Sequence, residues 1–162
     1  MHQRIRDPIH DLIEFNTDLE IERKAWEIIQ TEPFQRLRRV KQLGFSDFVF
    51  PGACHSRFAH SVGVFNTARQ LAEIVEAKLQ QEERAQRDIC LAAALVHDVG
   101  HGAFSHSFET VAKRLKLPIW KHEDWSDRLI REGEIAEILN HNFSGFANNV
   151  ADTVKGVGDR SV

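Results

Sequence analysis

The stretch LVHDVGHGAFSH, residues 95–106, places three histidines and an aspartate directly after a run of apolar residues. Ionisable groups at the end of a buried helix are costly unless they are paired or coordinate a metal. Neutral imidazole together with carboxylate is a ligand set for Mn, Fe, Ni or Zn, and less naturally for Mg. His97 and Asp98 therefore indicate either a divalent metal site or a buried imidazole hydrogen-bonded to a carboxylate.

Two glycines in this stretch determine where the other two histidines can point. Gly100 and Gly102 are expected to break the helix, so that His101 and His106 can point back toward the same spot. The spacing of HDVGH also matches a zinc-protease motif, in which two histidines four residues apart share one helix face. The glycine inside the motif, and Asp98 in place of the general-base glutamate, argue against a protease.

Helices are expected to hold these residues in place along nearly the whole chain. Thr17, with Glu20 in capping-box spacing, and Thr31 are expected to cap the first two helices. The run ICLAAALV has no polar side, which predicts that it belongs to the central, buried helix. Apolar periodicity, glycines and prolines give the boundaries. The expected elements are an extended or hairpin-like segment 5–15, helices 17–30, 31–44, 57–79, 87–99, 105–116, 122–132, 134–141 and 145–155, a loop 45–56 and a charged connection 82–87.

The composition describes an ordinary globular chain. It has 162 residues, of which 42% are hydrophobic, and 21 basic residues balance 24 acidic ones. This balance predicts no nucleic-acid partner. The sequence shows no signal peptide and no run of about 20 apolar residues, so we expect no membrane association and a cytoplasmic location. Two cysteines fit a reducing compartment, and Cys54 and Cys90 are interpreted as buried structural thiols.

Several strings in one order resemble a known family. HSRFAH at 55–60, HDVGHGAFSH at 97–106 and HE at 122–123 resemble the HD-domain phosphohydrolases. DPIHDLIEF, PFQRLRRVKQLG and VFPGACHSRFAHSVGV are similar to the N-terminal segments of one branch, the deoxynucleoside triphosphate (dNTP) triphosphohydrolases related to SAMHD1 and to bacterial dGTPases. The resemblance implies an all-α fold, an HD-domain helical bundle with a short extended N-terminal segment. We expect this domain over residues 1–155, followed by a frayed tail over 156–162.

The resemblance also implies roles for individual residues. The metal ligands of the family fall on His60, His97 and Asp98, which would hold one divalent ion, whether Mn, Fe, Ni, Zn or Mg. The family pattern ends on a further aspartate well downstream. Asp152 and Asp159 are the only aspartates after residue 127, and neither has the surrounding sequence of that ligand, so the fourth ligand is left unassigned.

The remaining site residues follow from the same resemblance. His101, His106 and His122 match catalytic histidines, with His106 the general acid and His101 a helper on the phosphate side, although these two roles can be exchanged. Arg57 is expected to bind substrate phosphates. Gln42 and Leu43 match the deoxyribose pocket, although a plain core position is as good an interpretation for Leu43.

The implied reaction is metal-dependent hydrolysis of a dNTP to a deoxynucleoside and tripolyphosphate. Gln35 and Arg38 match residues that bind an effector nucleotide in a homo-oligomer, whereas Arg36, Arg38, Arg39 and Lys41 could equally form a solvated face. Two alternatives stay open: an HD phosphohydrolase acting on another nucleotide or phosphoester, and a catalytically weak remnant that binds a metal, nucleotides or a sister subunit.

Overall fold

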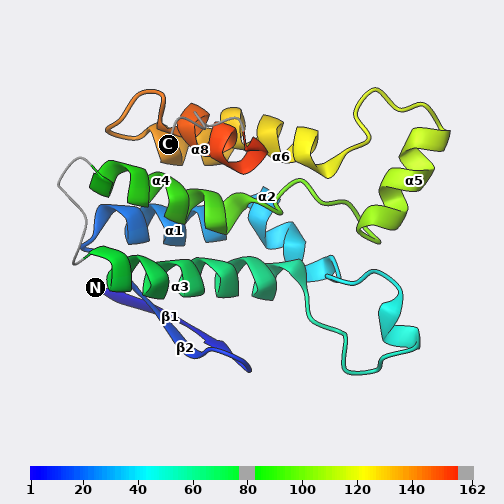
Figure 1. Ribbon diagram of the computed structural model, residues 1–162, viewed down its shortest axis with the longest axis horizontal. Helices are drawn as coiled ribbons and strands as arrows, with labels where there is room; N and C mark the ends of the chain where they lie inside the picture. Colours follow the sequence, from blue (N-terminus) through cyan, green and yellow to red (C-terminus); the bar gives the residue numbers. More distant parts are fainter. Residues whose placement is uncertain (77–82, 157–162) are drawn as a thin grey trace.

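A β-hairpin and a set of packed α-helices make up the protein, in agreement with the expected all-α class (Figure 1). The structure is a computed structural model and describes residues 1–76 and 83–156. Two short 3₁₀ helices, η1 and η2, lie in the connection before the longest helix. The elements are β1 (His2–Asp7), β2 (Asp11–Asn16), α1 (Glu20–Gln30), α2 (Glu32–Gln35), η1 (Arg36–Arg39), η2 (Ser46–Phe48), α3 (Arg57–Glu76), α4 (Glu83–Val96), α5 (His106–Arg114), α6 (His122–Arg131), α7 (Gly133–Asn140) and α8 (Phe146–Lys155).

The N-terminal hairpin confirms the expected extended segment. Its strands pair antiparallel in a register that sets Ile5 opposite Ile13. Alternate side chains of β2 face the core, because Ile13 and Phe15 are fully buried. The ring of Phe15 stacks on Phe65 of α3 at 5.6 Å, which fixes the hairpin against that helix.

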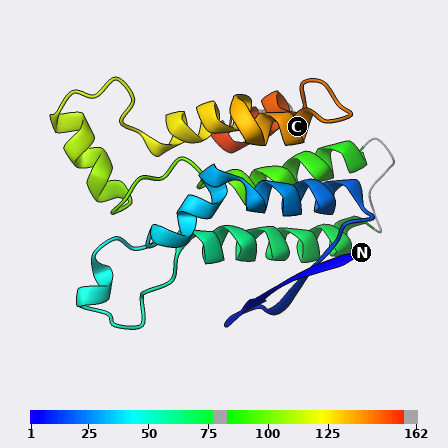
Figure 2. The same cartoon turned by 180° about the vertical axis from the view of Figure 1, so that it is seen from behind.

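The helices are arranged in layers around α4. Figure 1 shows α6 and α8 on one side, α1 and α4 in the middle, and α3 with the hairpin on the other side, and Figure 2 shows the same order from behind. Leu91, Leu95 and Val96 of α4 are almost completely buried, which confirms the prediction of a central helix. Among the described helices, none has both the length and the apolar character needed to cross a bilayer.

The expected helix over 31–44 is wrong. Only α2 and η1 form there, and Val40 already has an extended backbone. The reason is non-local pairing: Arg57 donates its backbone N–H to the Val40 carbonyl at 2.8 Å, and Gln42 donates to the His55 carbonyl at 3.0 Å. Helical periodicity cannot anticipate these bonds, which tie the end of the segment to the start of α3.

Four smaller expectations are also corrected. Leu19, not Thr17, occupies the cap position of α1, and the Thr17 hydroxyl donates to the Met1 carbonyl instead. Cys54 and Cys90 are exposed and not buried. The central helix ends at Val96, so the HD pair follows the helix and does not finish it. The expected charged connection over 82–87 is wrong for its described residues, because α4 already begins at Glu83. Apart from Gly156, the expected tail over 156–162 lies outside the described residues.

Candidate active site

A tight turn follows α4 and carries the first site residues. His97 still donates its backbone N–H to the Ala93 carbonyl, and His101 donates to the Asp98 carbonyl at 3.1 Å. Gly100 is required at the centre of this turn, because a Cβ there would lie 2.2 Å from the backbone nitrogen of Ser126 in α6. The turn is therefore packed directly against the start of α6, with no room for a larger residue.

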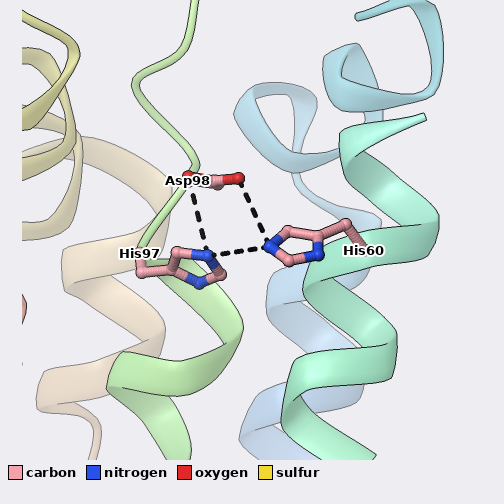
Figure 3. Close-up of side chains that lie close together, drawn as sticks. All are labelled: His60, His97 and Asp98. Carbon is pink, nitrogen blue, oxygen red and sulfur yellow. Dashed lines mark hydrogen bonds and ion pairs between the residues drawn. The ribbon is translucent and has the colours of Figure 1, made fainter. Parts of the chain in front are cut away.

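His60, His97 and Asp98 converge on one point, although they come from α3 and from the turn after α4 (Figure 3). The Nε2 atoms of His60 and His97 are 3.3 Å apart. The carboxylate of Asp98 lies 3.6 Å from Nε2 of His97 and 3.8 Å from Nε2 of His60. Two ligand atoms that share one ion at about 2.1 Å are separated by about 3 to 3.5 Å. The two imidazoles already have this spacing and Asp98 lies slightly beyond it, so a small movement of Asp98 would let the three groups bind one divalent cation.

The protonation of His97 also suits a metal ligand. Its Nδ1 lies 3.0 Å from the carbonyl oxygen of Ala94, which can only accept a hydrogen bond. Nδ1 therefore carries the proton, and Nε2 keeps its lone pair on the side that faces His60. A hydrogen bond from the ring nitrogen that does not bind the metal typically holds a metal-binding imidazole in one tautomer.

The charges of the site favour an ionised carboxylate between neutral imidazoles. Burial alone would raise the pKa of Asp98, but the hydrogen bond from His101, the neighbouring His97 and the positive charge of Arg57 outweigh it and lower the pKa well below its ordinary range. Burial lowers the pKa of His60 despite the nearby Asp98. Asp98 thus stays negative and His60 stays neutral near neutral pH, which are the forms that bind a cation.

Arg57 lies inside the site with its guanidinium already engaged. Its Nη1 donates to Oδ2 of Asp98 at 2.5 Å, and its Nε donates to the hydroxyl of Ser105 at 3.1 Å. Its Nη2 donates to the same hydroxyl and to the Gln42 carbonyl. The side chain is 3% exposed. Here Arg57 fixes the carboxylate of Asp98, and its contact with substrate phosphates stays a prediction.

The three other predicted histidines form a second cluster beside the first. The rings of His101 and His122 stack with centroids 3.7 Å apart, and the His106 ring lies 5.1 Å from His101 and 5.2 Å from His122. Nε2 of His101 is 3.3 Å from Oδ1 of Asp98, which joins the two clusters. The structure thus brings together all six predicted metal-binding and catalytic residues.

Glu109 of α5 contacts two of these histidines. It was not among the site residues predicted from the sequence. One of its carboxylate oxygens pairs with Nδ1 of His122, and the other lies 3.3 Å from Nδ1 of His106. Burial would raise the pKa of Glu109, but the hydrogen bonds from His122 and His106 lower it below its ordinary value. Its position one turn after His106 on the same helix was the available sequence signal.

The predicted sugar-binding residues lie at the edge of the site. The side-chain oxygen of Gln42 is buried without a hydrogen-bond partner among the described residues, so it can accept a hydrogen bond from a ligand. Leu43 is 49% exposed, which excludes the interpretation as a plain core residue. Neither observation tests the deoxyribose pocket itself.

The predicted effector residues lie together outside the site. Nε of Arg38 donates to the side-chain oxygen of Gln35 at 2.8 Å, and the guanidinium of Arg38 lies over the ring of Phe58 at 3.6 Å. The basic residues around them are not a uniformly solvated face, because Arg36 bonds to backbone carbonyls and Lys41 pairs with Asp47. Effector binding stays a prediction.

Asp152 is excluded from the cluster by its partners. Its Oδ1 accepts a hydrogen bond from Nη2 of Arg131 at 2.5 Å, where α8 packs against α6. Asp159 lies outside the described residues. The fourth ligand therefore remains unassigned.

The comparison with protein families decides the classification. By sequence, the HD domain matches residues 57–161, which include every histidine of both clusters and more than half of the chain. The chain belongs to the HD-domain family. His60, His97 and Asp98, which the resemblance implies as metal ligands, lie in the matched region, and their donor atoms converge in the structure.

Individual relatives confirm the resemblance to the SAMHD1-related branch. An uncharacterized protein of Bacillus subtilis, YwfO, is 39% identical over 150 residues, covering 92% of this chain and 32% of that protein. The deoxynucleoside triphosphate triphosphohydrolase SAMHD1 of Homo sapiens is 44% identical over 143 residues, covering 83% of this chain and 22% of that protein. The chain thus spans a third or less of the length of these relatives.

Solved structures share the fold. A hypothetical protein from Aquifex aeolicus superposes with a TM-score of 0.75 at 33% identity, covering 96% of this chain and 38% of that one. A phosphohydrolase from Bacteroides thetaiotaomicron also gives a TM-score of 0.75, at 28% identity, covering 99% of this chain and 36% of that one.

Proposed function

We propose that this HD-domain protein hydrolyses deoxynucleoside triphosphates to a deoxynucleoside and tripolyphosphate. The observation that carries the proposal is the convergence of His60, His97 and Asp98 beside a cluster of three further histidines. The name of the SAMHD1 relatives supports the substrate class, at about 40% identity over the matched region. A non-enzymatic remnant does not require a second histidine cluster oriented by its own carboxylate.

His60, His97 and Asp98 would hold the divalent ion. Such an ion, when bound, polarises a phosphoryl oxygen and acidifies water. The protein contributes three donor atoms that already face one another, so little reorganisation is needed on binding. Arg57 keeps the carboxylate of Asp98 in this position through its hydrogen bond at 2.5 Å.

The second cluster supplies the proton transfers. Water adds to the α-phosphorus and releases one proton to solvent, the bond from phosphorus to the 5′ oxygen breaks, and that oxygen takes a proton from His106, which is then reprotonated from solvent. His106 is suited to this role because its side chain is 67% exposed and its Nδ1 lies beside Glu109, which leaves Nε2 to face a substrate. Burial lowers the pKa of His101 and keeps it neutral, so it is a poor proton donor. Its Nδ1 has no partner among the described residues and can accept a hydrogen bond or a proton on the phosphate side.

Product analysis tests the proposal. The purified chain is incubated with Mn²⁺ or Mg²⁺ and each of the four dNTPs, and the phosphorus products are followed by ³¹P NMR. We expect tripolyphosphate and a deoxynucleoside, and we expect neither from Asp98→Ala. Release of pyrophosphate or monophosphate would contradict this reaction and favour another phosphoester substrate. The absence of turnover with every dNTP, while the metal still binds, would favour the binding remnant.

A further inference from the structure

Three groups of the proposed site depend on one short turn. His97, Asp98 and His101 lie within five residues, and these residues belong to no helix or strand. The peptide groups of such a turn must find partners outside regular secondary structure. Because the direction of each side chain follows from its backbone, whatever holds these peptide groups also aims the three side chains.

Arg36 of η1 holds one side of the turn. Its Nη1 donates to the His101 carbonyl at 2.5 Å, and its Nη2 donates to the Val99 carbonyl at 2.6 Å. These two carbonyls lie on either side of Gly100, so the planar guanidinium spans the turn with two hydrogen bonds. A lysine ammonium at this position lacks the fork that reaches both oxygens.

Ser126 of α6 holds the other side. Its side chain is fully buried. The hydroxyl accepts a hydrogen bond from the backbone N–H of Gly100 at 2.9 Å and donates to the His97 carbonyl at 3.0 Å. Arg36 and Ser126 together satisfy four polar backbone groups between residues 97 and 101, and they come from segments 90 residues apart in the chain.

We propose that Arg36 and Ser126 form a turn clamp, a pair of positioning residues that set the metal affinity of His97 and Asp98 without touching the ion. The inference rests on the metal centre of the proposed function. Mutation of residues that orient metal ligands through hydrogen bonds, without contacting the ion, typically lowers metal affinity by about 10- to 100-fold. Both clamp residues bond to the backbone next to a ligand, so the same range is expected here.

The test measures Mn²⁺ affinity without any nucleotide, from the EPR signal of free Mn²⁺ during titration of the full chain. The clamp variants are Arg36→Ala, Arg36→Lys and Ser126→Ala. Arg39→Ala is the matched control for the arginine, because no hydrogen bond or ion pair is seen for Arg39 among the described residues. Ser61→Ala is the matched control for the serine, because Ser61 is also fully buried and its hydroxyl has no described partner.

We expect Arg36→Ala and Ser126→Ala each to raise the Mn²⁺ dissociation constant by about 10-fold or more, with Arg36→Lys between Arg36→Ala and the unmodified chain. The double variant is expected to lose less than the product of the single effects, because both residues hold one turn. Thermal unfolding followed by circular dichroism checks that each variant is folded.

Two results would overturn the clamp. Folded variants that bind Mn²⁺ as tightly as their controls would show that Arg36 and Ser126 only support the fold. An unmodified chain that binds no Mn²⁺ would remove the clamp and the metal centre together. Mn²⁺ binding that depends on the clamp, without dNTP hydrolysis, would instead refute the proposed reaction alone.

Discussion

At the residue scale, the environments of the histidines divide their tasks. Burial keeps His60 and His101 neutral by lowering each pKa, whereas His106 is exposed beside the carboxylate of Glu109. The motif residues could be predicted from the sequence because the HD pair and its neighbours lie in short strings. Glu109 pairs with His122 across 13 residues, and Arg36 reaches His101 across 65, so no local pattern reveals these contacts.

His106→Ala tests the division of tasks. We expect the variant to bind the metal with unchanged stoichiometry and to lose at least about 100-fold in kcat, the usual contribution of one general acid. Single-turnover hydrolysis and metal titration measure the two properties separately. His141→Ala, another exposed histidine outside both clusters, serves as control. An unchanged kcat would remove His106 from the role of proton donor.

At the element scale, the site depends on how the ends of helices meet. The helices of the C-terminal half could be predicted well, because Pro118, Gly133 and Gly145 separate them. The segment 31–44 could not, because backbone bonds to residues 55–57 compete with its helical periodicity. The close approach of α6 to Gly100 was equally invisible in the sequence, since it is a contact between segments 26 residues apart.

Gly100→Ala tests this close approach. The added methyl group would meet the backbone of Ser126 and His122 at 2.2 and 2.3 Å, so α6 or the turn must move. We expect the free energy of unfolding to fall by about 1–3 kcal/mol, the usual effect of overpacking, in urea unfolding experiments. Gly52→Ala is the matched control, because nothing lies within 4 Å of its added Cβ. Equal stability of the two variants would mean that the turn and α6 are not in tight contact.

The attachment of α8 to α6 gives a pH-dependent prediction. Burial alone would raise the pKa of Asp127, but hydrogen bonds from Arg131 and Lys155 lower it below the ordinary value of 3.8. A carboxyl group whose pKa is lower in the folded than in the unfolded protein stabilises the fold at pH values above its ordinary pKa. This contribution to the free energy of unfolding disappears as the pH falls through the folded-state pKa.

Asp127→Asn should therefore reduce the free energy of unfolding by about 0.5–1 kcal/mol at pH 7 and have little effect near pH 2. Urea unfolding at both pH values measures the difference. Glu132→Gln, which breaks an exposed pair with Arg128, is expected to change less at either pH. A destabilisation by Asp127→Asn that is the same at pH 2 as at pH 7 would contradict the role of its charge.

At the scale of the whole molecule, both histidine clusters gather at one end of the layered bundle. Loop 45–56 and α5 extend at that end, while the N-terminus lies at the other (Figure 1). The fold class was predictable from the resemblance and the helical pattern. The proposed function therefore depends on the metal centre that this end of the bundle forms.

The most direct measurement is therefore the stoichiometry of Mn²⁺ binding by equilibrium dialysis, for the unmodified chain and for His60→Ala, His97→Ala and Asp98→Ala. We predict at least one tightly bound ion in the unmodified chain and the loss of that ion in each variant, because each removes one of the three converging donors. His141→Ala should retain it. Retention of the ion by folded Asp98→Ala, or the absence of binding by the unmodified chain, would contradict the metal centre on which the proposed function rests.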